Sequence, residues 1–229
     1  HRLRMNLLTA FAILLLSYLV GSIPSGWVVV KIASGRDLRF FGSGRTGGTN
    51  AMRAAGFLAG FFTALLDILK GVSAAWLVAW LRPGDVWLQA LAPIFTMLGQ
   101  IYSIFLIERK PDGRLHLRGG AGGATCLGGS IGLTPISLLI VFPAALFVYI
   151  FGGYASLTTI SIALVSTVLF SYRAIIGTGP WQHILYGVMA LMMVLWALRP
   201  NLERVRKGIE RPVGLRRARM KQRGEPIPE

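Results

Sequence analysis

Residues 119–172 read GGAGGATCLGGSIGLTPISLLIVFPAALFVYIFGGYASLTTISIALVSTVLFSY, a run of 54 residues without Asp, Glu, Lys or Arg. Further uncharged runs lie at 6–30, 86–107 and 174–198. A helix that crosses the hydrocarbon core of a membrane needs about 20 mostly apolar residues. Charged residues make up only 14% of the 229, against roughly 25% in an ordinary soluble domain. We therefore predict an all-α polytopic membrane protein, and the composition excludes a soluble enzyme, a secreted disulfide scaffold and a disordered tail protein.

Proline and glycine divide the long runs into separate spans. Breaks are expected at 132–135, at 152–153 and at 177–180, because the residue before a proline avoids the helical region and paired glycines weaken a helix. Seven spans result, near 7–30, 54–81, 86–107, 121–133, 136–151, 154–176 and 181–198. The fourth and fifth are short for full crossings and are expected to be tilted or re-entrant. The first apolar run is too long for a cleaved signal peptide and has no small-residue cleavage site after it.

Basic residues fix the predicted orientation. The chain carries 24 Lys and Arg against 9 Asp and Glu, concentrated in segments 31–55, 108–118 and 199–229. Basic segments between apolar spans stay on the cytoplasmic side, and seven spans place all three there, with the N-terminus outside and the C-terminus cytoplasmic. Residues 82–85 then form an external turn. Arg2 and Arg4 oppose this orientation and are outweighed by the three larger clusters.

The same charge pattern defines the predicted domains and partners. Residues 1–200 form a single integral-membrane domain, and residues 201–229 form a basic cytoplasmic tail. Because the charge follows the spans, it argues against a nucleic-acid partner and suits anionic lipid and phosphorylated substrates. One cysteine, Cys126, excludes intrachain disulfides and a cysteine metal site, and we expect it to pack in the core. The first residue is His1, which leaves open whether translation starts upstream or at Met5.

A glycine-rich stretch follows the first span and reads GSGRTGGTNAMR over residues 42–53. Glycines let backbone N–H groups approach an anion closely, and the stretch leads into a helix whose N-terminus favours negative charge. Hydroxyl, amide and guanidinium groups add donors. The sequence therefore predicts an anion site, and the alternative is a flexible linker with ordinary cytoplasmic charge. No Gly-Lys-Ser/Thr ends the stretch, so it is not a nucleotide P-loop.

Two further features leave alternatives open. Residues 118–125 read RGGAGGAT, which suits either an anion site or close packing of small residues between helices. Asp67 and Lys70 lie three residues apart inside the second span. Charges within a membrane suggest function, while this spacing also suits a structural ion pair on one helix face.

Taken together, the motifs resemble the bacterial membrane glycerol-3-phosphate acyltransferase family that uses acyl phosphate as donor. The matching segments, in chain order, are GSIP at 21–24, GSGRTGGTN at 42–50 with Arg53, LDxxKG at 66–71, GQxYSxFL at 99–106, GGAGxAT at 119–125 and NxxRxxxGxE at 201–210. The resemblance implies a seven-span fold in the bacterial inner membrane with its active site at the cytoplasmic face. It implies acyl transfer from acyl phosphate to the sn-1 hydroxyl of glycerol 3-phosphate, giving lysophosphatidate and phosphate in phospholipid biosynthesis, with no metal and no cofactor.

The sequence departs from the family pattern at four motif positions. Arg45 replaces Asn, Gly48 replaces Ala, Gln100 replaces His and Ala121 replaces Lys, and about nine extra residues lie around 109–117. We expect Arg45 or Arg118 to replace the charge missing at Ala121, because arginine binds phosphate bidentately. Gln100 cannot act as a base at neutral pH, so a substrate phosphate would accept the hydroxyl proton.

These considerations define the expected site. The residues expected to be catalytic are Ser43, Arg45, Thr49, Asn50, Arg53 and Arg118. Those expected to bind substrate are Gly42, Gly44, Gly47, Lys70, Gln100, Gly119, Gly120, Gly122, Thr125, Asn201 and Arg204. The expected partners are acyl phosphate, glycerol 3-phosphate and membrane lipid. Two other functions stay open: a catalytically impaired relative that binds lipid phosphate or a partner, and a small-solute transporter, which would have inverted repeats and a polar site at the membrane midplane.

Overall fold

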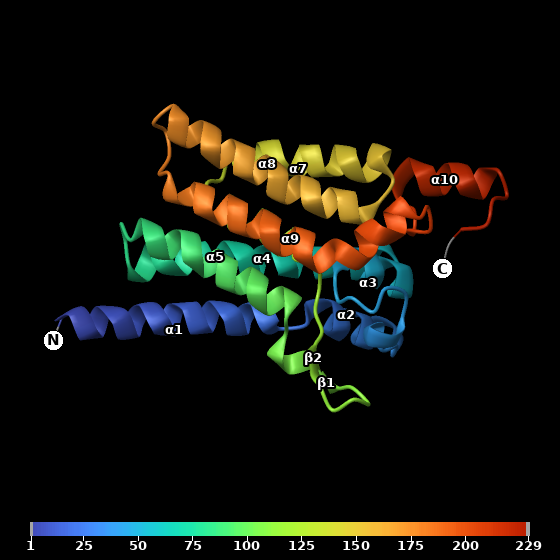
Figure 1. Cartoon of the computed structure of the whole chain (residues 1–229), viewed down its shortest axis with the longest axis horizontal. Coiled ribbons are helices and arrows are strands. Elements are labelled where there is room, and N and C mark those ends of the chain that lie inside the picture. The colour runs from blue at the N-terminus through green and yellow to red at the C-terminus, as the bar shows by residue number, and fades with distance from the viewer. Residues whose placement is uncertain (1, 228–229) are drawn as a thin grey trace.

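The computed structural model describes residues 2–227. Residue 1 of the predicted domain and residues 228–229 of the predicted tail lie outside the described residues. The chain is a helical bundle with one small β-hairpin (Figure 1). The elements are α1 (Arg2–Ser22), α2 (Ser25–Ser34), η1 (Leu38–Phe40), α3 (Gly48–Ala55), α4 (Phe57–Leu81), α5 (Val86–Ile101), η2 (Ile104–Leu106), β1 (Ile107–Arg109), β2 (Leu115–Leu117), α6 (Gly123–Leu133), α7 (Ser137–Phe147), η3 (Val148–Gly152), α8 (Ala155–Ile175), α9 (Gln182–Arg206) and α10 (Gly214–Gln222).

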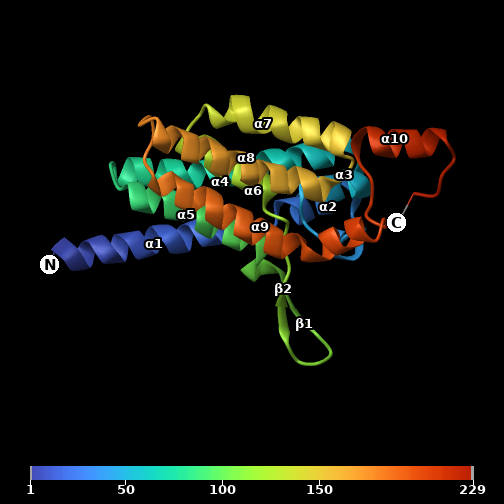
Figure 2. The same ribbon diagram turned by 45° about the horizontal axis from the view of Figure 1, so that its top comes forward.

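Seven apolar helical segments run along the bundle in alternating directions (Figures 1 and 2). Five segments within residues 2–227 are long and apolar enough to cross a membrane, namely Leu7–Ser34, Phe57–Leu81, Val86–Leu106, Ala155–Ile175 and Gln182–Arg206. The other two, α6 and the α7–η3 segment, are shorter. Eleven helical residues rise only about 16 Å, so α6 is shorter than the hydrocarbon core of a typical bilayer, which is about 30 Å thick.

The predicted breaks between the last spans are confirmed, and one further break is present. Helices end before Pro135, at Gly153 and at 177–180. Gly153 has a φ of 77°, which a residue with a side chain rarely adopts. The first predicted span is divided at Pro24, because a proline has no N–H to donate and its ring clashes with the preceding turn. The second span starts at Phe57 rather than 54, since α3 forms a separate short helix.

Glycines set the closest helix contacts. A Cβ atom built on Gly128 of α6 would lie 2.0 Å from the carbonyl oxygen of Ile68 on α4, and one on Gly99 of α5 would lie 2.1 Å from that of Tyr18 on α1. Real Cβ atoms cannot approach so closely. These two helix pairs therefore pack backbone to backbone, as small residues allow in membranes.

The largest cluster of buried side chains joins α5, α6, α7, α8 and α9. Cys126 is fully buried within it, as predicted for a packing residue, and the Tyr186 hydroxyl donates to its carbonyl oxygen at 2.6 Å. Serines also pair across the helices, with Ser130 Oγ 2.7 Å from Ser166 Oγ. This core holds α6 and α8 side by side, which places their first residues close together.

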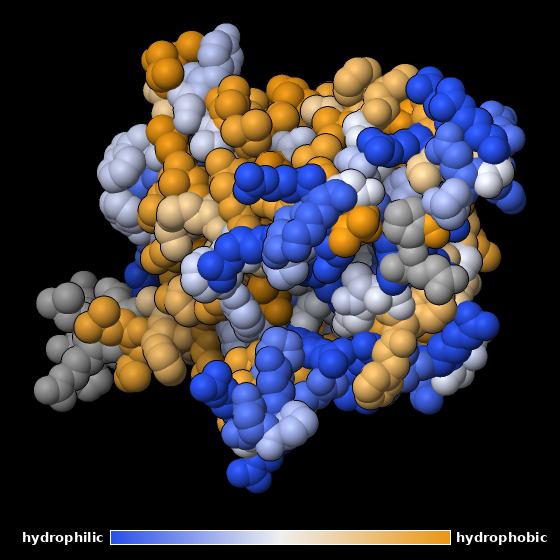
Figure 3. Space-filling view, turned by 45° about the vertical axis from the view of Figure 1, so that its right-hand side comes forward, coloured by the Kyte–Doolittle hydropathy of each residue, from blue (hydrophilic) through white to orange (hydrophobic). Residues whose placement is uncertain are grey.

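One end of the bundle carries most of the polar structure. The helices α2, α3 and α10 lie at this end, and the hairpin projects sideways near it (Figures 1 and 2). Viewed toward this end, hydrophilic side chains spread over the surface and hydrophobic ones lie along the sides (Figure 3). The predicted domain boundary at 200 falls inside α9, which continues through Pro200 to Arg206. The first residues of the predicted tail are thus part of the last long helix.

Candidate active site

A cavity of about 590 Å³ opens at the polar end of the bundle. Its lining comes from the first glycine-rich loop, from the helices α3, α4, α5, α6, α7, η3, α8 and α9, and from the segment that follows α9. The predicted residues that line it are Gly42, Ser43, Arg45, Gly47, Thr49, Asn50, Arg53, Gln100, Gly122, Thr125, Asn201 and Arg204. The predicted residues that do not line it are Gly44, Lys70, Arg118, Gly119 and Gly120. The fold therefore gathers segments some 150 residues apart in sequence around one space.

Asn50 holds the glycine-rich loop in shape. Its side-chain amide donates to the carbonyl oxygens of Phe41 and Arg45, both at 2.9 Å, and its Oδ1 accepts from the backbone N–H of Ser43 at 3.3 Å. Gly42 has a φ of 59°, and a Cβ there would lie 2.3 Å from Asn50 Oδ1. All three interactions of the buried amide are internal to the loop. Asn50 thus positions the loop backbone and the Ser43 side chain.

Three helices begin at the cavity wall. The first residues of α3, α6 and α8 are Gly48, Gly123 and Ala155, and all three line the cavity. The N-terminus of a helix has unpaired backbone N–H groups and a partial positive charge. On α6 and α8 the hydroxyls of Thr125 and Ser156 are buried, line the same space and have no hydrogen-bond partner within residues 2–227. Buried polar groups are normally paired, so this wall is suited to an anion.

Arginines supply full charges to the same space. Arg45 donates to the carbonyl oxygen of Ala197, and burial together with the nearby Arg204 lowers the pKa of Arg45. Burial and the nearby Arg211 likewise lower the pKa of Arg53. A lowered pKa means that the surroundings disfavour the cationic form. Because neither Arg45 nor Arg53 has an ion-pair partner among the described residues, an anion in the cavity would stabilise both.

The end of α9 closes one side of the cavity. Glu210 accepts hydrogen bonds from the Asn201 amide at 2.9 Å and from Arg204 Nε at 2.8 Å. This carboxylate fixes both side chains, and Asn201 Oδ1 is buried without a partner in the described chain. Arg211 also lines the cavity, and a Cβ on Gly42 would lie 2.8 Å from Arg211 Nη1. Sequence reasoning missed Arg211 because its proximity to the glycine-rich loop arises only in the fold.

Asp67, Lys70 and Gln100 form a closed buried network. Lys70 Nζ lies 2.9 Å from Asp67 Oδ1 and 3.1 Å from Gln100 Oε1, and it also donates to the carbonyl oxygen of Ile23. Gln100 Nε2 donates to Asp67 Oδ2 at 2.8 Å. An ammonium has three protons to donate, so Lys70 has none left for a substrate. The ion-pair alternative for Asp67 and Lys70 is thus what the structure contains, and Gln100 bridges its two charges.

An apolar groove leads from the charged end toward the sides of the bundle. The groove residues on α4 are three or four positions apart, so they lie on one face of that helix. A second set at helical spacing, on α7 and η3, lines the opposite side of the groove. The α4 set is Phe57, Phe61, Ala64 and Ile68, and the facing set is Phe142, Ala145, Leu146 and Tyr149. Phe57 and Phe61 are 70% and 50% exposed, which shows that the groove is open along the surface of the bundle. Tyr149, at the junction of groove and charged end, was not identified from the sequence.

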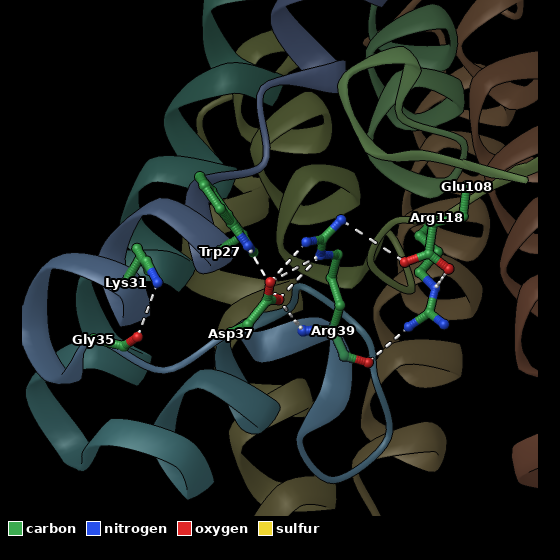
Figure 4. A network of polar contacts seen from close by, with 7 residues as sticks. All are labelled: Trp27, Lys31, Gly35, Asp37, Arg39, Glu108 and Arg118. Atoms are coloured by element: carbon green, nitrogen blue, oxygen red, sulfur yellow. Dashed lines mark hydrogen bonds and ion pairs between the residues drawn. The ribbon is translucent and has the colours of Figure 1, made fainter.

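Arg118 belongs to a different cluster, outside the cavity. Asp37, Arg39, Glu108 and Arg118 form a polar latch between the first loop and the hairpin (Figure 4). Arg39 Nη2 lies 2.7 Å from Asp37 Oδ2, Arg118 Nε lies 2.6 Å from Glu108 Oε2, and Arg118 Nη1 donates to the Arg39 carbonyl oxygen at 2.7 Å. The hydrogen bond from Arg39 lowers the pKa of Asp37 to about 2.

The two glycine-rich segments are also joined by their backbones. Thr46 N–H donates to the Gly119 carbonyl oxygen at 3.3 Å, and Gly120 N–H donates to that of Gln100 at 2.8 Å. A Cβ on Gly119 would lie 2.4 Å from the Gln100 carbonyl oxygen. Gly119 and Gly120 therefore serve close packing, while Gly122 and Thr125 face the cavity. The close-packing alternative thus applies to the first half of residues 118–125, and the anion-site alternative stays a prediction for the second half.

The family model described as glycerol-3-phosphate acyltransferase matches residues 11–208. The chain belongs to this family. It is similar to glycerol-3-phosphate acyltransferases of Chlorobium phaeobacteroides, with 32% identity over 89% of this chain and 96% of the relative, and of Thermus thermophilus, with 36% identity over 89% and 94%.

Solved structures agree with this membership. The fold is similar to a crystal structure of PlsY (YgiH), an integral membrane glycerol 3-phosphate acyltransferase, in its glycerol 3-phosphate form. The TM-score is 0.76 at 28% identity, over 92% of this chain and 98% of the other. The lysophosphatidic acid form gives a TM-score of 0.74 at 28% identity, over 90% and 96%. With its apolar helices, the chain is a multi-pass membrane protein of the PlsY type.

Proposed function

We propose that this protein transfers an acyl group from acyl phosphate to the sn-1 hydroxyl of glycerol 3-phosphate, giving lysophosphatidate and phosphate. The observation that carries the proposal is the shape and chemistry of one cavity. Its inner end combines arginines with three helix N-termini, and its outer part is an open apolar groove. Two phosphorylated substrates, one with a long acyl chain, need this combination. The names of the similar proteins, which act on glycerol 3-phosphate, support the same assignment.

The two phosphate groups would occupy different walls. The loop from Gly42 to Gly47, with Ser43, Thr49 and Arg45, surrounds one of them. Arg53, Asn201 and Arg204 reach the other across the cavity, together with Thr125 and Ser156 at the N-termini of α6 and α8. Charge-assisted hydrogen bonds to phosphate are the strong ones in such a site. The acyl chain would lie in the groove between α4 and α7, open to lipid.

Acyl phosphate is already activated, so the protein needs to orient and to stabilise charge. The sn-1 oxygen of glycerol 3-phosphate attacks the acyl carbonyl carbon and forms the ester bond, while the bond from that carbon to the phosphate oxygen breaks. The hydroxyl proton passes to the departing phosphate. Asp67 does not serve as the base in this proposal, because its carboxylate is paired with Lys70 and held by Gln100.

We further propose seven membrane spans with the N-terminus outside, and with α10 and the rest of the tail in the cytoplasm of a bacterial cell, below its inner membrane. In this arrangement α6 and α7 form the two short spans. The positive segments that include α2, α3 and α10 lie at one end of the bundle, which agrees with the positive-inside rule. The cavity then opens to the cytoplasm, where both substrates are expected.

The deciding experiment uses the full chain in phospholipid vesicles with labelled glycerol 3-phosphate. Palmitoyl phosphate should give labelled lysophosphatidate, and palmitoyl-CoA at equal concentration should not. Transfer only from the thioester would refute the donor assignment. Binding of glycerol 3-phosphate without transfer from either donor would favour the impaired relative. Uptake of label into the vesicle lumen without product would favour the transporter.

A further inference from the structure

The β-hairpin is the one sheet within residues 2–227 of this helical protein. It spans β1 and β2, whose strands pair in the register Ile107 with Leu117, Glu108 with His116 and Arg109 with Leu115. Both ribbon views show it projecting sideways from the bundle, across the direction of the long helices (Figures 1 and 2). It starts where α5 and η2 end, at the polar end of the apolar segment Val86–Leu106. It therefore extends over the region where the headgroups of surrounding lipids lie.

The two faces of the hairpin differ in chemistry. Side chains alternate along a strand, and directly paired residues share a face. One face thus carries Ile107, Leu115 and Leu117 with Arg109. The other carries Glu108 and His116, and the alternation continues to Lys110 and Arg114 at the turn.

No part of the described chain covers the apolar face. Leu115 is 70% exposed and Ile107 is 46% exposed. The apolar surface continues into η2, where Phe105 is 58% exposed, and reaches Leu98 near the end of α5, which is 36% exposed. An exposed apolar face that is continuous with the membrane-spanning surface belongs at the boundary between acyl chains and headgroups.

The charges of the hairpin complement an anionic lipid surface. Arg109, Lys110 and Arg114 are exposed, and the ion pair from Arg114 to Asp112 is long, at 3.8 Å, and fully at the surface. Arg109 extends from the apolar face, and Lys110 and Arg114 extend from the turn at the tip. Long basic side chains of this kind reach phosphate at headgroup level. Each basic residue near an anionic leaflet contributes about 1 kcal/mol.

We propose that this hairpin is a membrane-surface arm that lies on the leaflet next to the bundle and binds the headgroups of anionic phospholipids. The polar latch connects the arm to the catalytic end, because Glu108 at the arm's base pairs with Arg118, which in turn holds Arg39. An arm on the lipid surface therefore holds the first loop at the same level. The arm is separate from the cavity, so the proposal does not depend on which acyl donor is used.

The test places a fluorophore on each face of the hairpin. Leu115→Cys and His116→Cys are labelled in a Cys126→Ser background, and the full chain is incorporated into nanodiscs that contain lipid with a quencher near its headgroup. In nanodiscs with phosphatidylglycerol we expect stronger quenching at 115 than at 116. In phosphatidylcholine alone the quenching at 115 should fall. Equal quenching at both positions, or no effect of lipid charge, would overturn the proposal.

Charge variants give an independent readout. Each basic residue changes the ratio of membrane-bound to free arm by about fivefold. We therefore expect this ratio to fall by about 100-fold in the triple variant Arg109→Gln/Lys110→Gln/Arg114→Gln. In this variant, quenching of the fluorophore at position 115 should fall to the level measured for the unchanged hairpin in phosphatidylcholine alone. The matched control Arg217→Gln/Arg219→Gln/Lys221→Gln removes the same charge from α10 and should leave quenching unchanged. An equal loss in both variants would show a net-charge effect only and would overturn the arm. The proposal would also be overturned if an added soluble protein shielded the fluorophore while the lipid quencher had no effect on it.

Discussion

Replacement of Arg45 by alanine tests how this protein compensates for a missing lysine. Both Arg45 and Ala121 line the cavity, whereas Arg118 faces the polar latch. Of the two arginines that the sequence offered as a replacement for the lysine charge, only Arg45 therefore lies where a substrate phosphate would be bound. We expect Arg45→Ala to lower kcat/KM for glycerol 3-phosphate, and Arg118→Ala to have a smaller effect that acts through the loop.

The size of the effect follows from the lost interaction. A hydrogen bond to a charged group is worth about 1.5–3 kcal/mol, and about 1.4 kcal/mol of transition-state stabilisation is a factor of ten in rate. The loss in kcat/KM should be about 10- to 150-fold. Stability should change in a different manner. Burial and Arg204 disfavour the Arg45 cation in the substrate-free protein, whereas its hydrogen bond to the Ala197 carbonyl oxygen stabilises the fold. Because these two effects oppose each other, Tm should change less than kcat/KM.

The assay measures initial rates with palmitoyl phosphate and labelled glycerol 3-phosphate, alongside thermal unfolding in detergent. Lys207→Ala is the matched control, since Lys207 is exposed at the same end of α9 and pairs only with Glu203 among the described residues. Ala121→Lys should recover part of the rate in the Arg45→Ala background. A variant that inserts normally and retains nearly full kcat/KM would refute the charge-replacement account and leave family membership untouched.

Three further predictions follow from the fold. In a Cys126→Ser background, a cysteine at Phe40, which is 78% exposed, should react with an impermeant reagent only from the cytoplasmic side, and one at Gly84 only from outside; the reverse pattern would contradict seven spans. Gly128→Ala should destabilise the bundle by about 1–3 kcal/mol, because its Cβ would lie 2.0 Å from the Ile68 carbonyl oxygen, and an unchanged Tm would disprove this contact. The pKa of Asp37 is lowered from 3.8 to about 2. Ionised Asp37 therefore stabilises the folded protein above pH 3.8, and this stabilisation is lost as the pH falls toward 2. Asp37→Asn should accordingly flatten the decline of Tm over this interval, and parallel curves would exclude a contribution from this group.

Local sequence signals predicted the apolar helices well. Uncharged runs identify helices in a membrane protein because every backbone group must be paired within its own segment, and Pro135 and Gly153 ended helices for local reasons. The hairpin also had a local signal. Pro111-Asp112-Gly113 is a typical turn sequence between short apolar stretches, and the turn closes with Lys110 N–H donating to the Arg114 carbonyl oxygen at 2.9 Å.

Site residues were predictable where a motif formed its own local structure. The glycine-rich loop is such a case, because Asn50 bonds only to residues within nine positions of itself. Tyr149 and Arg211 could not be found in this manner, since only the packing of η3 and of the segment after α9 brings them to the cavity. The orientation of Arg118 likewise depends on Glu108, a residue at the base of the hairpin. Residue types thus indicated the chemistry, and long-range contacts decided which side chains take part.

The closure of the cavity by the segment after α9 has a consequence for biosynthesis. The glycine-rich loop leaves the ribosome well before Asn201, Glu210 and Arg211, which lie some 150 residues later in the chain. The closing contact comes later still, because Val213 N–H donates to the Gly153 carbonyl oxygen at 2.9 Å. A nascent chain that ends before α9 therefore has only an open half of the cavity. The cavity gains its full lining only after the segment that follows α9 has been made, so that shorter chains in the membrane lack a complete site.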